Sequence, residues 1–206
     1  MNVTQMNQPI LKFCEKSDLD ELYEVYLKNH PTSNYSLKNF NEYFDNVPNA
    51  MLLGFVDGKL VAHLFCHPIK IDDYTKCNDW GTYQYFNPEG DYLYIWGAGI
   101  LKEYRTRYNF AWSVQNKQME YNLNKYKTIQ KSILHTVDNP KLYKWHLLAG
   151  YIPAYVVNFV KIGDEIKNLI VLEMELRKHV EEHGYKELKR IYGYVNTGII
   201  PQFIER

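Results

Sequence analysis

Residues 91–151 carry an ordered succession of local signals that few folds can accommodate. A strand pattern is followed by a polar turn, a long helical pattern, a second strand and then Asn139-Pro140, which opens another helix that ends at Gly150-Tyr151. The five elements are residues 91–100, 101–107, 109–125, 132–137 and 139–149. Strands that alternate with helices over this length predict an α/β fold, in which helices pack on the faces of a central sheet.

Local signals before and after this segment add further strands and helices. The clearest is Asp57-Gly58, a pair that favours a type I′ turn and joins two strands as a hairpin. Ser17-Asp18 predicts the start of a helix that His30-Pro31 closes, and Ser36 predicts the cap of a second helix. The predicted elements outside 91–151 are strands at 10–13, 51–56, 59–65, 155–162 and 168–176, and helices at 18–30, 37–45 and 178–192.

Residues 68–90 read as irregular chain, and a long irregular segment in a compact domain is often functional. It contains Trp80, Tyr83, Tyr85 and Phe86. These rings would line the mouth of a substrate site or, alternatively, pack onto the sheet as the loop's own small core. An extension of the hairpin is a third interpretation, and the sequence leaves all three open.

The composition narrows the class of protein. With 206 residues, 46% of them apolar, we expect one domain with a substantial core. Lys+Arg and Asp+Glu both number 24, which argues against a general nucleic-acid binder. The first residues are polar and unlike a secretory leader, and no apolar run approaches the roughly 20 residues of a membrane helix. The three cysteines, Cys14, Cys66 and Cys77, are odd in number, and their spacing matches no CxxC or zinc-binding pattern. We therefore expect a cytoplasmic protein with reduced thiols and no membrane association.

The order of elements in 91–151, with the hairpin before it, resembles the acetyl-CoA-binding core of the GNAT superfamily of N-acyltransferases. The resemblance covers roughly residues 10–176. It implies an α/β fold with a single GNAT-like domain, a mixed central sheet of about seven strands and helices on both faces. We expect this domain to occupy residues 1–176, and residues 177–206 to form a helical extension packed on it. Such an extension often serves dimer contacts, so a homodimer is one expectation.

By this resemblance the acyl donor is acetyl-CoA, with its pyrophosphate at the turn before the long helix. A helix N-terminus suits an anion, because its first N–H groups are free and its dipole is positive there. Ile100 and Lys102 would pair the pantetheine arm through main-chain groups, and Asn139 would hydrogen-bond it. The donor-binding residues implied in this way are Ile100, Lys102, Arg105, Arg107, Tyr108, Asn109, Phe110, Ala111 and Asn139.

The turn departs from the family pattern Arg/Gln-x-x-Gly-x-Gly/Ala, in which x is any residue. Arg105 matches the first position, whereas Tyr108 and Phe110 stand where glycines are expected. Glycine lets the backbone approach the pyrophosphate closely, but a larger residue still presents its N–H if its side chain points away. Arg105 and Arg107 would add charge-assisted contacts to phosphate, or would otherwise be solvated arginines of a surface turn.

The acid–base residues are less clearly indicated. The helix after Asn139 holds His146 where the family places a general-acid tyrosine, and Tyr143 lies one turn earlier. Either side chain could protonate the departing thiolate, although His146 could also simply pack against the sheet. The family's strand glutamate corresponds to Trp96, which cannot accept a proton. His135 is therefore the nearest candidate base, with solvent or no dedicated base as the alternatives. Gly97 and Gly99 favour a bulge or a close backbone approach in the strand before the turn.

The acceptor is expected to be an amine on a small molecule or a peptide, in a pocket shaped by Tyr35, Tyr94 and Trp96. No metal is expected. His63 and His67 would be about 13 Å apart on a strand, and His179 and His183 have no third ligand. The resemblance therefore implies direct acyl transfer from acetyl-CoA to an amine. Two alternatives stay open: an inactive module that binds acyl-CoA or a protein partner, and an acyltransferase that takes its acyl group from a carrier protein.

Overall fold

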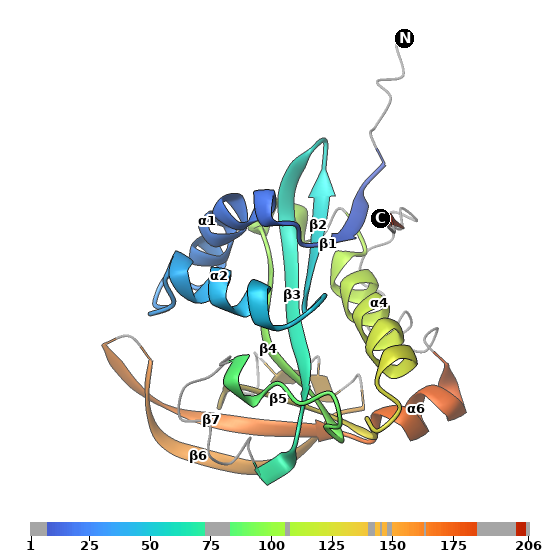
Figure 1. The fold of residues 1–206 in the computed structure, drawn as a ribbon. Helices are drawn as coiled ribbons and strands as arrows, with labels where there is room; N and C mark the ends of the chain where they lie inside the picture. Colours follow the sequence, from blue (N-terminus) through green and yellow to red (C-terminus); the bar gives the residue numbers. More distant parts are fainter. Residues whose placement is uncertain are drawn as a thin grey trace.

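The computed structural model describes residues 8–72, 83–105, 108–139, 143–144, 146–147, 150–162, 164–184 and 201–204. Within these residues, one eight-stranded sheet has the order β6-β7-β5-β4-β3-β2-β1-β8 (Figure 1). The described part of the chain therefore forms the single mixed α/β domain that the sequence predicted.

The first half of the chain follows the prediction closely. Strand β1 (Ile10–Phe13) is followed by helices α1 (Leu19–Asn29) and α2 (Leu37–Asn46). The amide of Asn39 donates to the Ser36 hydroxyl, which makes Ser36 the cap of α2. Strands β2 (Met51–Val56) and β3 (Lys59–Ile69) form an antiparallel hairpin. Its turn has positive φ at both Asp57 and Gly58, as a type I′ turn requires.

Strand β3 is longer than predicted, because it continues through Pro68 to Ile69. Proline has no N–H and is tolerated in a strand where that side needs no partner. The β2–β3 ladder begins at the pair Met51–Phe65, so Pro68 lies beyond it and pairs only with Leu93 of the next strand. Residues 68 and 69, which we predicted to be irregular, are thus part of the sheet, and Tyr83–Tyr85 form a short 3-10 helix.

The central segment contains β4 (Tyr92–Ile100), a 3-10 turn (Lys102–Tyr104), α4 (Phe110–Lys125) and β5 (Lys131–Val137). Strands β4 and β5 are parallel neighbours, whereas the remaining internal pairs of the sheet are antiparallel. This sequence of strand, turn, helix and strand is the one predicted from residues 91–137.

The last elements are β6 (Ile152–Ile162), β7 (Glu165–Met174), α6 (Leu176–His183) and β8 (Gln202–Phe203). Strand β7 inserts between β5 and β6, so β6 lies at one edge of the sheet. The predicted helix at 178–192 begins earlier and its described part ends at His183; residues 185–200 lie outside the described residues. Strand β8 pairs in parallel with β1, so the extension contributes a strand as well as a helix.

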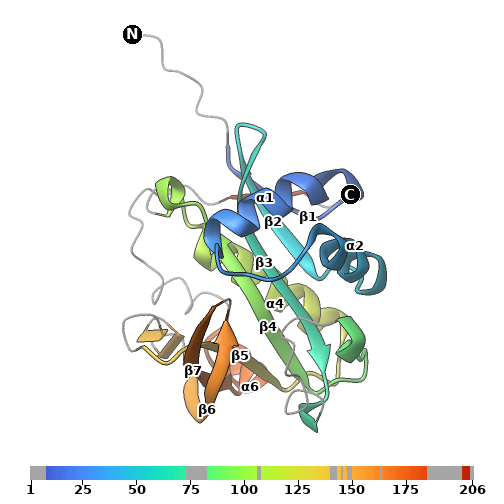
Figure 2. The same ribbon diagram turned by 90° about the vertical axis from the view of Figure 1, so that its left-hand side faces the viewer.

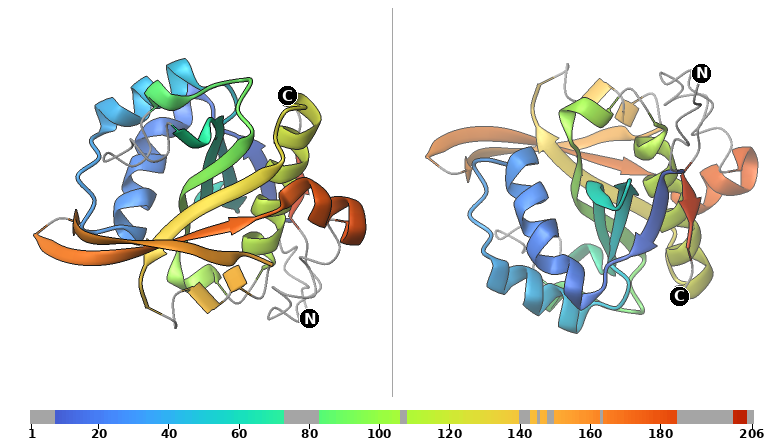
Figure 3. Two further views of the ribbon diagram at one scale, coloured as in Figure 1. Left: turned by 90° about the horizontal axis from the view of Figure 1, so that it is seen from below. Right: turned by 90° about the horizontal axis from the view of Figure 1, so that it is seen from above.

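The helices cover the sheet in two layers. Helices α1 and α2 lie on one side of β2 and β3, and α4 lies on the other, with α6 near the lower end of α4 (Figures 1 and 2). The β6–β7 hairpin projects past the sheet on the side of α1 and α2 (Figures 1 and 3). Both faces of β2 and β3 are buried, which explains their nearly continuous apolar sequences.

Candidate functional site

Strands β4 and β5 separate part of the way along the sheet. Their described ladder consists of four residue pairs and ends at Ile95–Leu134, although β4 runs on to Ile100 and β5 to Val137. We call the diverging ends, residues 96–100 and 135–137, the β4–β5 fork. Ala98 is exposed although β4 is an inner strand, which shows that solvent reaches the fork.

A bulge in β4 marks the point of divergence. Cys66 of β3 pairs with Ile95 and Phe65 pairs with Gly97, so Trp96 is an extra residue on β4. An extra residue bends a strand and increases its twist, which turns the end of β4 away from β5. The predicted bulge near Gly97 and Gly99 is present. A side chain on either glycine would collide with the ring of Phe65 or of His63 at 2.6 Å, so these glycines make room for aromatic packing.

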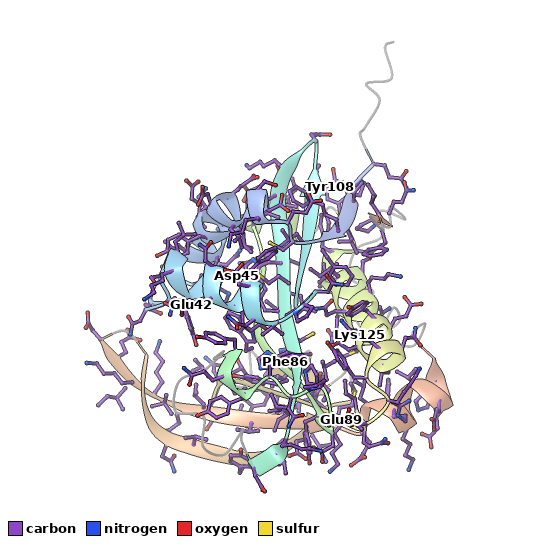
Figure 4. All side chains as sticks on the ribbon, viewed as in Figure 1. Glu42, Asp45, Phe86, Glu89, Tyr108 and Lys125 are labelled. Carbon is purple, nitrogen blue, oxygen red and sulfur yellow. The ribbon has the colours of Figure 1, made fainter. Side chains whose placement is uncertain are left out.

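The start of α4 lies just beyond the fork, and Figure 4 labels Tyr108 at this end of the helix. Tyr108 is 7% exposed and Phe110 is fully buried. The Phe110 ring fills the space beside Gly54 of β2, where a Cβ would come within 2.6 Å of it. Tyr108 and Phe110, the two side chains that stand at the expected glycine positions, are therefore buried in the core.

The side chain of Asn109 does not cap the N-terminus of α4. The first hydrogen bond of the helix runs from the Ser113 amide to the Asn109 carbonyl at 2.9 Å. The amides before Ser113 lack an acceptor within the helix, as at any helix start. The residues of this end that the structure describes, Tyr108, Asn109, Phe110 and Ala111, are the ones that sequence analysis assigned to pyrophosphate.

Arg105 is exposed in the same turn and reaches back to β4. Its Nε donates to the carbonyl of Ile100 at 2.9 Å, which anchors the arginine at the mouth of the fork. One main-chain acceptor that a pantetheine arm could use is therefore already occupied. Lys102 is exposed in the 3-10 turn, and Arg107 lies outside the described residues.

The helix after β5 is described in part. The Tyr143 amide donates to the Asn139 carbonyl at 3.3 Å, so Asn139 stands at the start of this helix. The helix ends where Tyr151 N donates to His146 O at 3.0 Å, with Gly150 at φ +93°. Glycine at this left-handed position explains the Gly150-Tyr151 signal in the sequence.

Burial changes the chemistry expected of His146. Its ring lies edge-on to Tyr151, with 5.9 Å between centroids, and its Nδ1 is buried without a partner among the described residues. Burial lowers the pKa of His146 to about 4, so the ring is neutral at physiological pH. Tyr151 also hydrogen-bonds Ser132 of β5 at 2.7 Å, and Ser132 pairs with Leu93 in the closed part of the β4–β5 ladder. These contacts place His146 beside the closed end of the fork.

Aromatic side chains gather on the opposite side of the sheet, beside α1 and α2. Trp96 lies 5.5 Å from Tyr35 and 5.0 Å from Tyr43 between ring centroids, and both Trp96 and Tyr35 are partly exposed. Tyr94 is 2% exposed and its hydroxyl lies 3.4 Å from Nδ1 of His135. The structure thus brings Tyr35 and Trp96 together at the surface, while Tyr94 lies beneath them in contact with His135.

His30 is a further residue of this site, and no pattern in the sequence pointed to it. His30 follows α1 and hydrogen-bonds the main chain of Ala98 at the fork. Burial lowers its pKa, and the bond to Ala98 partly opposes that shift. We interpreted His30-Pro31 only as a helix end, and no local signal ties it to β4. Its position depends on how α1 packs against the sheet.

His63 and His67 of β3 are both 1% exposed, and burial lowers the pKa of each to about 3. His63 stacks on Phe65, and Nδ1 of His67 lies 2.7 Å from the Tyr43 hydroxyl. They are core residues in this structure. The described residues contain no group of three side chains suited to hold a metal ion, and none of their helices is long and apolar enough to span a membrane.

No protein-family model and no curated protein matches this sequence. Solved structures do match, with TM-scores of 0.59 to 0.65 among the most similar. The ribosomal-protein-S18-alanine N-acetyltransferase of Escherichia coli has a TM-score of 0.61 at 11% identity, covering 82% of this chain and 94% of that one. Naa50 of Arabidopsis thaliana, bound to the bisubstrate analogue CoA-Ac-MVNAL, has a TM-score of 0.61 at 16% identity; the match covers 81% of this chain and 97% of Naa50. The GNAT-like decarboxylase GphF, in complex with isobutyryl-CoA, has a TM-score of 0.61 at 13% identity; the match covers 81% of this chain and 99% of GphF.

These likenesses extend over about four fifths of the chain and nearly all of each solved structure. At such low identity they establish the arrangement of the chain and leave the reaction to be argued from the site. The order of β4, turn, α4 and β5 and the bulge in β4 are the features that the sequence pattern predicted. The chain has the fold of the GNAT superfamily.

Proposed function

We propose that this protein is an N-acyltransferase that moves a short acyl group, acetyl in the simplest case, from acyl-CoA to an amine. The observation that carries the proposal is the β4–β5 fork followed by the turn that leads into the start of α4. Diverging strands offer main-chain groups to an extended arm, and the helix start offers N–H groups to a pyrophosphate. The solved structures with isobutyryl-CoA and with a CoA bisubstrate analogue have this fold, which supports the same donor class here.

The donor would lie along the fork with its pyrophosphate at the amides of residues 108–111. The buried side chains of Tyr108 and Phe110 would not stand between these amides and the donor. Arg105 is close enough to add a charged contact to phosphate. Because the Ile100 carbonyl accepts from Arg105, the pantetheine arm would use the other main-chain groups of the fork, with Asn139 at its far side.

In the reaction, the amine nitrogen attacks the thioester carbonyl carbon. The new C–N bond forms, the C–S bond breaks, and the amine proton is lost to solvent or a base while the thiolate gains one. His146 is neutral at physiological pH, so it would serve as a hydrogen-bond donor to sulfur and not as an imidazolium acid. The Tyr143 phenol is the alternative proton donor, since it lies one turn earlier on the same helix.

Calorimetric titration with acetyl-CoA tests the donor site. We expect micromolar binding that Arg105→Ala weakens about tenfold or more, because a hydrogen bond to a charged group contributes roughly 1.5–3 kcal/mol. Lys38→Ala is the matched control: it also removes one positive charge, from an 83% exposed side chain on α2. Equal affinities of both variants and the wild type would place the donor elsewhere. No binding at all would remove coenzyme A from the proposal.

Steady-state kinetics separate the two candidate acids. If Tyr143 protonates the thiolate, Tyr143→Phe lowers kcat by about 10²-fold or more, whereas His146→Gln has a smaller effect. The opposite ranking would assign the role to His146. Unchanged kcat in both variants would show that solvent protonates the thiolate.

One observation favours an alternative without catalysis. The segments that border the fork, residues 30–36, 92–100 and 131–137, contain no Asp or Glu, so the family's carboxylate base has no equivalent there. An acyl-CoA-binding module would need no base. Donor binding without turnover over a broad amine panel would support that module, and preference for an acylated carrier protein over acyl-CoA would support the carrier-dependent enzyme.

A further inference from the structure

On the side of the fork that faces α1 and α2, the described segments that border it offer no acidic side chain to an alkylamine. The connector 30–36 and strands β4 and β5 carry no carboxylate. The acids of α2 are engaged with lysines: Glu42 lies 3.7 Å from Lys38, and Asp45 lies 2.9 Å from Lys16. In Figure 4 both acids project from α2. At the β6–β7 turn Glu165 is paired with Lys167.

Two imidazoles lie on this side of the fork, among the residues that the structure describes. His30 contacts Ala98, and His135 contacts Tyr94. Burial lowers the pKa of both rings, so they are neutral at physiological pH and have little tendency to take a proton. Lys131 of β5 stands at the closed end of the ladder, where it pairs with Glu175 at 3.0 Å.

An alkylamine would meet two difficulties in these surroundings. Its pKa is close to that of lysine, about 10.4, so at pH 7 fewer than about one molecule in a thousand is neutral and able to attack. Residues 30–36, 92–100 and 131–137, which the structure describes, contain no carboxylate to remove the proton, and the two buried imidazoles there are weak bases. An aromatic amine is already neutral at this pH, because its nitrogen lone pair is delocalised into the ring.

The neighbouring side chains suit a flat apolar ring. Tyr35 and Trp96 are partly exposed, and their rings are tilted by 44° at 5.5 Å. Such rings pack well against another aromatic ring in an offset or tilted arrangement. The position of Trp96 is set by the β4 bulge, which places it where the strands diverge.

We infer that the acceptor is a weakly basic aromatic amine, which binds with its ring against Tyr35 and Trp96 and its nitrogen toward the fork. This inference rests on the proposed acyl transfer and specifies its substrate class. The nitrogen attacks the thioester carbon as a neutral nucleophile, the C–S bond breaks as the C–N bond forms, and the surplus proton passes to water. No basic side chain is needed before the attack.

Two isomeric amines test the inference at constant size and composition: 4-methylaniline, which is weakly basic, and benzylamine, which is strongly basic. With saturating acetyl-CoA at pH 7, we expect kcat/KM to be at least tenfold higher for 4-methylaniline. Its rate should be nearly constant between pH 7 and 9, whereas any benzylamine rate should rise about tenfold per pH unit as the neutral amine becomes more abundant. Release of free coenzyme A thiol provides the readout.

Tyr35→Leu should raise KM for 4-methylaniline several-fold while leaving the affinity for acetyl-CoA unchanged. Tyr121→Leu is the matched control, since Tyr121 packs on Phe13 and hydrogen-bonds Asn49, remote from the fork residues. A thermal melt of each variant confirms folding.

Faster acetylation of benzylamine would overturn the inference, because the aromatic residues would then be holding an alkylammonium ion. Turnover of other amines but of neither isomer would also overturn it while leaving acyl transfer intact. Absence of acetyl-CoA binding would instead refute the proposed function itself.

Discussion

The contact between Gly54 and Phe110 connects the core to the start of α4, and Gly54→Ala is the sharpest way to perturb it. A Cβ at position 54 would lie 2.6 Å from Cε1 and 2.8 Å from Cδ1 of Phe110, and 3.1 Å from Cβ of Ala62. Carbon atoms in contact prefer about 3.5–4.0 Å. The Phe110 ring must therefore move by about 1 Å, and because Phe110 is the first residue of α4, the helix start must move with it.

Overpacking of this kind costs roughly 1–3 kcal/mol of unfolding free energy. With a urea m-value of about 2 kcal/mol/M, the midpoint should fall by about 1 M. Acetyl-CoA affinity should fall too, since the amides that would contact pyrophosphate are displaced. Phe110→Leu replaces the ring with a smaller side chain and should by itself lower the unfolding free energy by about 1 kcal/mol or more. The double variant should nevertheless be more stable than the sum of the two single losses of unfolding free energy predicts.

The test is a double-mutant cycle measured by urea unfolding and calorimetric titration. A coupling of at least about 1 kcal/mol between positions 54 and 110 is expected. Gly58→Ala is the control, because a Cβ there meets nothing within 4 Å and its cost comes from φ +76° alone, so it should not couple to Phe110→Leu. Additive costs at 54 and 110, within about 0.5 kcal/mol, would refute the reasoning.

Three further predictions concern stability. Burial lowers the pKa of His63 and of His67 to about 3, whereas imidazoles of the unfolded chain take up protons below about pH 6.5. The free energy of unfolding should therefore fall as the pH drops from about 6.5 toward 3, by about 2 kcal/mol per histidine at pH 5. Equal urea midpoints at pH 7 and pH 5 would contradict this prediction. Tyr151→Phe breaks the buried 2.7 Å bond to Ser132 and should cost about 1–3 kcal/mol in urea unfolding. Gly150→Ala should lower Tm measurably, because φ is +93° and its Cβ would press on His179 at 3.3 Å.

Much of the fold follows from short-range signals. The Asp57-Gly58 turn, the Ser36 cap and the glycine at 150 each determine local geometry whatever surrounds them, and each is found where the sequence predicted it. The elements that sequence reasoning missed depend on distant partners. Strand β8 is two residues long and exists only because β1 offers it an edge, and β3 extends through Pro68 because β2 has already ended.

Some features of the candidate site could likewise be predicted from the sequence, and others depend on distant packing partners. The pattern around Arg105 and Asn139 indicated where a donor would lie, since the order of elements determines which loops meet. The sequence could not show that Tyr108 and Phe110 turn inward, because Gly54 makes that room from another strand. Nor could it show the burial that makes His146 neutral. These properties arise from packing between elements.

The pairing of β8 with β1 has a mechanical consequence. The two strands are parallel and pair through only two residues each; hydrogen bonds of 2.8 Å, from the Gln202 amide to the Pro9 carbonyl and from the Ile204 amide to the Leu11 carbonyl, flank this ladder at the edge of the sheet. A force that pulls on the two ends of the chain acts on this ladder in shear, and a ladder of only two residue pairs resists weakly. In an optical trap the β1–β8 edge should therefore yield first, in a small early extension step, while β4, β5 and α4 still hold together.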